Sequence, residues 1–216
     1  MEHLNSLTYY AATKKYDLSF PTLDNDLDVD VVIIGGGFTG INTALELAEK
    51  GITNVAVLEA KHLGYGGTGR NGGQIMAGLG HDLDTVKKHV GKDGLEELFK
   101  LGNIGASIIR ERVEKYNIDA DFCQGYAYLG FNSRQEKTLR TWMDEFKKAT
   151  PDEEITLHTG SEVQDVIGSP AYSCALKHMA EGNNHSLTLL LGDAKSAYEL
   201  DSPNYEHTQT HAEETR

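Results

Sequence analysis

Apolar residues change their spacing several times along the chain, and each change marks the border of a predicted element. A mainly apolar run at residues 29–34 ends at three glycines, which predicts a strand buried on both faces, as in a parallel sheet. The next apolar residues share one helical stripe that closes at Gly51, namely Ile41, Ala44, Leu45 and Ala48. A second apolar run at residues 54–60 follows, and this order of elements predicts a right-handed βαβ unit.

Further elements are predicted in the rest of the chain. Apolar residues recur with helical spacing between Leu95 and Tyr116, and again between Leu139 and Phe146. Residues 123–131 predict a strand between these two helices. Residues 187–198 predict an amphipathic helix, for which either Asn184 or Ser186 can be the N-cap. We expect residues 1–27 to form an arm that leads into the first strand, and the polar end from residue 207 to fray.

The stretch from Val29 to Ala48 is long and apolar enough to suggest a membrane span. Its three glycines, Asn42, Glu46 and the change from strand to helix spacing favour a buried strand and a packed helix instead. The first twenty residues lack the basic start and apolar run of a secretion signal. We therefore expect no membrane span.

Composition and charge narrow the classes of function. The apolar fraction of 39% and the charged fraction of 25% are typical of a globular chain of 216 residues. The formal net charge of −13 repels nucleic acid and anionic membrane surfaces; it either favours cationic small molecules or simply aids solubility. Cys123 and Cys174 lack metal-site or redox spacing, which favours a reducing, cytoplasmic location. The histidines are scattered, so we expect no metal site.

The glycines after the first strand fit the pattern G-x-G-x-x-G, and they lie between a predicted strand and a predicted helix, as this motif requires. Gly35 allows a sharp turn, Gly37 allows the backbone to approach a pyrophosphate, and Gly40 allows close packing of helix and strand. The helix N-terminus adds unpaired N–H groups and a partial positive charge. Glu59, at the end of the second strand, can bind the ribose hydroxyls of an adenosine and repel a 2′-phosphate, which disfavours NADP. The segment predicts a dinucleotide site.

A second glycine cluster, "GYGGTGRNGGQ" at residues 64–74, has no purpose in a simple NAD-binding unit. Its bare backbone can lie along the far end of a longer cofactor, and FAD is the obvious candidate. Arg70 supplies a donor there, although it can equally form a structural salt bridge. Either both glycine clusters are loose loops, or both contact one extended ligand.

The stretches "DVVIIGGGFTG" and "VLEAKHLGYGGTGRNGGQ" resemble the opening of the D-amino-acid-oxidase-like flavoproteins, in the glutathione-reductase-type FAD superfamily. The likeness is greatest to the bacterial gamma-glutamylputrescine oxidases. The later blocks "CQGYAYLGFNSRQ", "VIGSPAY" and "HSLTLLLGDAKSAYEL" resemble the same family in the same order. The resemblance implies an α/β fold, with a Rossmann-like FAD-binding domain and part of a substrate domain, truncated.

The resemblance also implies roles for individual residues. The diphosphate and adenosine ribose are expected at Gly35, Gly37, Phe38, Thr39, Gly40, Glu59 and Ala60. The diphosphate, ribityl chain and flavin ring of a noncovalent FAD are expected to run beside Thr68, Gly69, Arg70, Asn71, Gly72, Gly73 and Gln74. The implied activity is oxidation of a C–N bond in a small amine such as gamma-glutamylputrescine, with dioxygen as acceptor. No catalytic side chain is assigned.

Some features depart from the family's pattern. Gly67 and Thr68 stand in place of Ala-Ser, Ser186 replaces a proline, and Thr210 stands where a valine near the adenine is usual. The chain is also shorter than such oxidases. Two alternatives stay open: an amine oxidase represented by its N-terminal half, or an FAD- or ADP-binding remnant or subunit without turnover of its own. The expected domains are an arm (residues 1–27), two parts of an FAD-binding domain (28–105 and 171–216) and a partial substrate domain (106–170).

Overall fold

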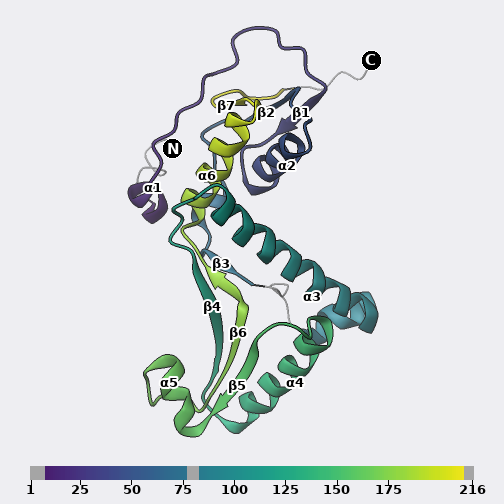
Figure 1. Ribbon diagram of the computed structural model, residues 1–216, viewed down its shortest axis with the longest axis vertical. Helices are drawn as coiled ribbons and strands as arrows, with labels where there is room; N and C mark the ends of the chain where they lie inside the picture. Colours follow the sequence, from purple (N-terminus) through teal and green to yellow (C-terminus); the bar gives the residue numbers. More distant parts are fainter. Residues whose placement is uncertain (1–7, 77–82, 212–216) are drawn as a thin grey trace. The chain divides into compact units, whose positions relative to one another are not determined.

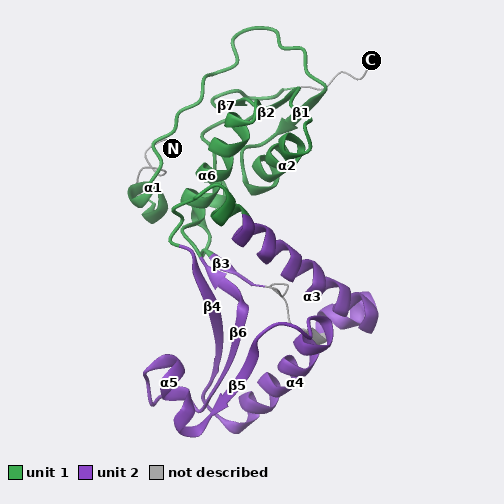
Figure 2. Ribbon diagram, viewed as in Figure 1, with its two compact units in different colours: residues 1–73, 112–121, 184–216 green, residues 74–111, 122–183 purple. Residues whose placement is uncertain are grey.

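The computed structural model describes residues 8–76 and 83–211, and the chain folds as two compact units. Unit 1 combines residues 1–73, 112–121 and 184–216, and unit 2 combines residues 74–111 and 122–183 (Figure 2). The chain therefore leaves unit 1 and returns to it twice. Among the described residues, no helix is long and apolar enough to cross a membrane.

Unit 1 is built on a three-stranded parallel sheet with the order β1-β2-β7 (Figure 1). Its strands are β1 (Val31–Ile34), β2 (Val55–Leu58) and β7 (Asn204–Tyr205). Helix α2 (Phe38–Glu49) connects β1 to β2, and α6 (Ser186–Glu199) precedes β7. The predicted strand–helix–strand unit is confirmed, and so is the α/β class. The arm contains the short helix α1 (Tyr9–Thr13).

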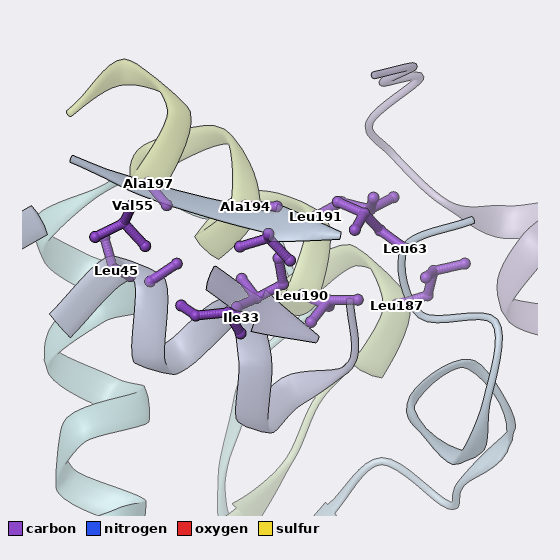
Figure 3. Packing of buried hydrophobic residues seen from close by; sticks show 12 residues of the cluster. Ile33, Leu45, Val55, Leu63, Leu187, Leu190, Leu191, Ala194 and Ala197 are labelled. Carbon is purple, nitrogen blue, oxygen red and sulfur yellow. The ribbon is translucent and has the colours of Figure 1, made fainter. Parts of the chain in front are cut away.

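The core of unit 1 lies between the sheet and its two helices. Figure 3 shows Ile33 of β1, Leu45 of α2, Val55 of β2 and Leu190 of α6 in one buried cluster. Leu45, Val55 and Leu190 are fully buried. Burial of side chains of this size contributes about 1.5–3 kcal/mol each. This cluster fixes the strand ends that carry the glycine turns.

The expectation that the first strand is buried on both faces is wrong for β1. Ile33 points into the cluster, whereas Val32 and Ile34 are 51% and 54% exposed. Successive strand residues point to opposite faces, and the buried residues of α2 and α6 pack on the Ile33 side. The other face of β1 is therefore only partly covered by the described residues.

Two further expectations about unit 1 need correction. The N-cap of α6 is His185, not Asn184 or Ser186, because its Nδ1 accepts a hydrogen bond from the Thr188 N–H at 3.1 Å. The polar end does not fray from residue 207. His207 N–H donates to the Lys61 carbonyl at 3.0 Å, and Thr208 N–H donates to the Glu59 carbonyl at 2.9 Å. Residues 212–216 lie outside the described part of the chain.

Unit 2 is an antiparallel sheet with helices. Strand β6 (Cys174–Asn183) pairs with β3 (Gln74–Ile75), β4 (Cys123–Gly130) and β5 (Ile155–Thr159). The helices are α3 (Leu83–Lys115), which has a kink at Gly91 and whose last residues belong to unit 1, α4 (Ser133–Ala149) and the short α5 (Val163–Ile167). The predicted helices at 95–116 and 139–146 and the predicted strand at 123–131 are confirmed.

The sequence did not predict β5 and β6, and two expected domain borders fall elsewhere in the structure. The expected border between residues 105 and 106 lies inside α3, whereas the two compact units divide between residues 111 and 112 of the same helix. Residues 174–183, expected in the FAD-binding domain, form β6 and pair with the other strands of unit 2. Pairing of β6 with the distant strands β4 and β5 sets the second of these borders.

Candidate functional site

The first glycine segment makes a tight turn from β1 into α2. Gly35 has a φ of +102°, which favours glycine, and its N–H donates to the Leu58 carbonyl at 2.8 Å. A Cβ at Gly40 would lie 1.9 Å from the Gly35 carbonyl oxygen, so the helix can begin here only with a bare backbone. Gly37 is the N-cap of α2. The first N–H groups of this helix form a natural anion-binding end.

The second glycine segment lies directly against this helix end. Gly64 N–H donates to the Gly36 carbonyl at 2.8 Å, and the Phe38 N–H donates to the Thr68 hydroxyl at 3.2 Å. Residues Gly67–Arg70 form a short 3₁₀ helix. A Cβ at Gly69 would lie 2.6 Å from the Gly64 carbonyl oxygen, which explains a bare backbone inside this turn. The two glycine clusters thus form one surface rather than two separate loops.

Glu59 stands at the end of β2 beside the first glycine segment. One carboxylate oxygen accepts the Gly36 N–H at 2.8 Å, and the other accepts the Lys61 N–H at 2.7 Å. Two backbone donors therefore fix the orientation of the carboxylate. A carboxylate oxygen has further lone pairs that can accept bonds from hydroxyl groups. Ala60 is exposed next to it.

Asn71 and Gly73 hold the end of the second segment in place. The Asn71 side-chain amide donates to the Thr68 carbonyl at 3.0 Å, and its oxygen accepts the Gly73 N–H at 2.7 Å and the Ser186 hydroxyl at 2.5 Å. Gly73 has a φ of +69°, and a Cβ there would lie 2.2 Å from the Asn184 carbonyl oxygen. Gly72 is exposed between them. These contacts attach the segment to the start of α6.

Arg70 and Gln74 occupy different surroundings. The Arg70 guanidinium donates to the Gly66 carbonyl at 3.1 Å and lies over the Tyr65 ring, 4.8 Å from its centroid. Gln74 is the first residue of unit 2, where its side chain donates to the Tyr126 hydroxyl at 3.1 Å. Within unit 1, the structure brings together the residues from Gly35 to Gly40, Glu59 and Thr68.

This arrangement fits an extended dinucleotide. Added Cβ atoms at Gly35, Gly66 and Gly67 would meet nothing within 4 Å, so the backbone faces open space at these points. The N-terminus of α2 provides N–H groups and partial positive charge for a diphosphate, and Glu59 provides acceptors for a ribose diol. The donor set and the open backbone both agree with such a ligand.

His185 has a structural role that its sequence position did not reveal. Because Nδ1 accepts the Thr188 N–H, Nε2 carries the proton and donates to the Thr13 hydroxyl at 2.9 Å, which in turn donates to the Tyr9 carbonyl at 2.7 Å. The imidazole also packs against Tyr10, with ring centroids 4.8 Å apart. His185 therefore connects the arm to the start of α6.

Unit 2 contains buried polar side chains that the sequence analysis missed. Glu181 is fully buried and accepts a hydrogen bond from the Tyr128 hydroxyl at 2.9 Å. Burial, and then the Glu181 charge, raises the pKa of Tyr128 far above its ordinary value. His178 is also fully buried; burial, and then the charge of Arg110, lowers its pKa to about 4. Because polar residues interrupt the apolar pattern of β6, hydrophobic spacing does not predict this strand.

Within residues 8–76 and 83–211, no group of three or more histidine, cysteine, aspartate or glutamate side chains is placed to hold a metal ion. Both cysteines are free thiols: Cys123 is exposed and Cys174 is buried. His3 and His81 lie outside the described residues.

Comparison with known proteins gives consistent matches. The DAO family model, described as "FAD dependent oxidoreductase", matches residues 30–214. The chain is 35% identical over 193 residues to gamma-glutamylputrescine oxidoreductase of Escherichia coli, covering 89% of this chain and 44% of that protein. It is 37% identical over 199 residues to a probable oxidoreductase, OrdL, of Haemophilus influenzae, covering 92% of this chain and 46% of that protein. The chain thus spans about half the length of these relatives.

Two solved structures show the same fold. L-amino acid deaminase from Proteus myxofaciens superimposes with a TM-score of 0.72 at 23% identity, covering 90% of this chain and 42% of that one. L-proline dehydrogenase from P. horikoshii gives a TM-score of 0.68 at 21% identity, covering 85% and 45%. At this identity the likeness concerns the fold alone.

Proposed function

The chain belongs to the DAO family of FAD-dependent oxidoreductases, and from this premise we propose that its unit 1 binds FAD noncovalently across both glycine segments. One observation carries the proposal. The Gly64 N–H bonds the Gly36 carbonyl and the Phe38 N–H bonds the Thr68 hydroxyl, so the two segments form one continuous surface. A single extended ligand can therefore contact both.

Each part of the surface suits one part of the cofactor. The N-terminus of α2, from Gly37 to Gly40, would hold the diphosphate, with Thr68 beside it. Glu59 would accept the hydroxyls of the adenosine ribose, and Ala60 would lie next to it. The segment from Gly69 to Gly73, oriented by Asn71, would lie along the part of the cofactor that leads to the flavin ring. Gln74, in unit 2, belongs to the same proposed set.

We further propose that the chain contributes to the oxidation of a small amine, with dioxygen as the electron acceptor. When bound, FAD supplies the acceptor for the hydride removed from the carbon beside the amine nitrogen. The relative from E. coli, named as a gamma-glutamylputrescine oxidoreductase, motivates gamma-glutamylputrescine as the first substrate to test. Unit 2 is proposed as part of the substrate domain, with the borders of the compact unit rather than residues 106–170.

A second candidate is an FAD- or ADP-binding subunit without turnover of its own. The supporting observation is coverage: the chain spans 44% and 46% of the two relatives, so about half of each relative has no counterpart in it. The adenosine and diphosphate part of the proposed site lies entirely within unit 1. Cofactor binding and catalysis can therefore be separated in this chain.

The experiment measures binding and turnover on the same preparation. The purified chain is titrated with FAD and with ADP, and flavin fluorescence and absorbance are recorded. Acid precipitation then shows whether the flavin leaves the protein, as noncovalent binding requires. Hydrogen peroxide is assayed with gamma-glutamylputrescine. FAD binding with peroxide production supports the oxidase. Binding of FAD or of ADP without peroxide supports the second candidate, and absence of binding of both ligands refutes both candidates.

A further inference from the structure

We propose that a cavity in unit 1 binds a small carboxylic acid with an apolar body. The cavity has a volume of about 380 Å³, is open to solvent on one side, and is lined by the N-terminal arm, the loop that follows β2, and α6. Sites for small molecules have volumes of about 300–1,000 Å³. Among the described residues, its lining includes none of Gly35–Gly40 and not Glu59. The cavity therefore lacks the proposed contacts of the first glycine segment and of Glu59, but it shares Gly69 and Arg70 with the part of the proposed FAD site that leads to the flavin ring.

The walls of the cavity supply the contacts for an apolar body. Leu18 comes from the arm, Leu63 from the loop, and Leu187 and Leu191 from successive turns of α6. Leu63 is 4% exposed and belongs to the core cluster, as do Leu187 and Leu191. The apolar wall is thus part of the rigid core of unit 1, and a ligand does not have to create it.

Two cations on the lining select the charge of the ligand. The Arg70 guanidinium is held in place by the Tyr65 ring and the Gly66 carbonyl. Lys14 pairs with Asp17 at 2.9 Å, but the Asp17 side chain is 99% exposed. Such solvent-exposed pairs contribute at most about 1 kcal/mol, so the carboxylate of a ligand can replace Asp17. The chain has a formal net charge of −13, so the presence of Lys14 and Arg70 on one cavity makes this place more favourable for an anion than most of the surface.

Glu206 also lines the cavity, but its oxygens are already engaged. One accepts the Leu63 N–H at 2.7 Å and the other accepts the Phe20 N–H at 3.2 Å. These bonds fasten the arm and the loop to the same side chain and so maintain the shape of the cavity. The carboxylate of the ligand is therefore directed to Lys14 and Arg70.

The test uses three probes with the same apolar body and different heads: phenylbutyrate, phenylbutanol and phenylbutylamine. Each is titrated into the purified full chain by isothermal calorimetry. We expect the acid to bind at least about threefold more tightly than the alcohol, and the amine to bind most weakly. Equal or tighter binding of the alcohol or amine, or no binding of the acid, overturns the proposal.

Lys14→Gln is expected to weaken binding of the acid, with Arg70 keeping part of the preference, and to leave binding of the alcohol unchanged. Lys195→Gln is the matched control, because Lys195 is exposed on α6 and does not line the cavity. Unchanged acid binding in Lys14→Gln overturns the proposal. FAD is titrated separately: acid binding without FAD binding refutes only the proposed cofactor site, and the reverse refutes only the proposed acid site.

Discussion

At the residue scale, bare backbone is required for different reasons at different glycines. Gly40 needs it for packing, because a Cβ would collide with the Gly35 carbonyl oxygen. Gly35 needs it for its positive φ, although space is open beside it. At Gly37 neither reason is strong, since a Cβ would lie 3.3 Å from the Thr68 hydroxyl. We propose that a ligand at the helix end explains glycine at this position.

Gly37→Val is expected to weaken FAD binding at least about tenfold, or about 1.4 kcal/mol, because the side chain would occupy the place proposed for the diphosphate. The measurement is a fluorescence titration with FAD. Gly105→Ala is the control: Gly105 lies within α3, and a Cβ there would meet nothing within 4 Å. The control should keep its FAD affinity and gain up to about 1 kcal/mol in stability. Equal FAD affinity in Gly37→Val and the unmodified chain contradicts the proposed placement.

At the element scale, a cluster of charged side chains around the buried Arg112 connects α2 to the end of α3. The guanidinium of Arg112 donates to Asn42 at 2.6 Å, to Glu46 at 2.8 Å and to Glu49 at 2.9 Å. Burial alone would raise the pKa of Glu49, but hydrogen bonds from Lys115, Tyr116 and Arg112 outweigh it and lower the pKa to about 2. The ionised Glu49 carboxylate therefore stabilises the folded chain above about pH 4.5, and this stabilisation is lost as the pH falls from about 4.5 towards 2.

Asp193 of α6 has the opposite pH dependence. Burial, opposed by the charge of Arg112 and reinforced by that of Glu49, raises the pKa of Asp193 to about 7. Between about pH 4 and pH 7 the folded chain holds a proton that the unfolded chain releases, so stability falls as the pH rises. Asp193→Asn removes this ionisation. We expect the variant to be more stable than the unmodified chain by a margin that grows up to about pH 8.

Thermal unfolding at about pH 5 and about pH 8 tests this expectation. Asp144→Asn, at an exposed position of α4, is the control and should follow the unmodified chain at both values. A stabilisation of Asp193→Asn that is equal at the two values, or absent, would show that Asp193 does not titrate in this range.

At the scale of the whole molecule, each unit is assembled from segments that are distant in the chain. Unit 1 needs residues 184–216 to complete its sheet with β7 and its core with α6. Unit 2 needs β6 to join β3, β4 and β5. Ligand effects can therefore be assigned to units by hydrogen exchange, which reports on local stability.

Hydrogen exchange with FAD and with ADP separates the two ends of the proposed site. FAD is expected to slow exchange in both glycine segments, residues 35–40 and 64–73. ADP is expected to slow exchange in the first segment more than in the second, because it lacks the ribityl chain and the flavin. At about a hundredfold excess over Kd, binding stabilises the unit by about 2.7 kcal/mol. Protection by FAD confined to the first segment would contradict a site that extends across both.

Much of the local structure of the first seventy residues could be predicted from the sequence, because it depends on near neighbours. The strand at β1, the glycine turn and α2 follow one another directly, and apolar spacing reveals each. Strand β6 escaped prediction, because Lys177, His178 and Glu181 interrupt its apolar pattern although they lie in a sheet. The cap at His185 also escaped, because histidine is not among the usual N-cap residues.

The sequence by itself determined the family of this protein, the βαβ unit, the open glycine backbone and the acidic residue at the end of β2. These features depend on residue type and short spacing. Only the tertiary structure decided that Thr68 meets Phe38, that β6 lies among the other strands of unit 2, and that one face of β1 is exposed. The reason is physical: each of these results depends on packing or hydrogen bonding between segments far apart in the chain, which local patterns do not record.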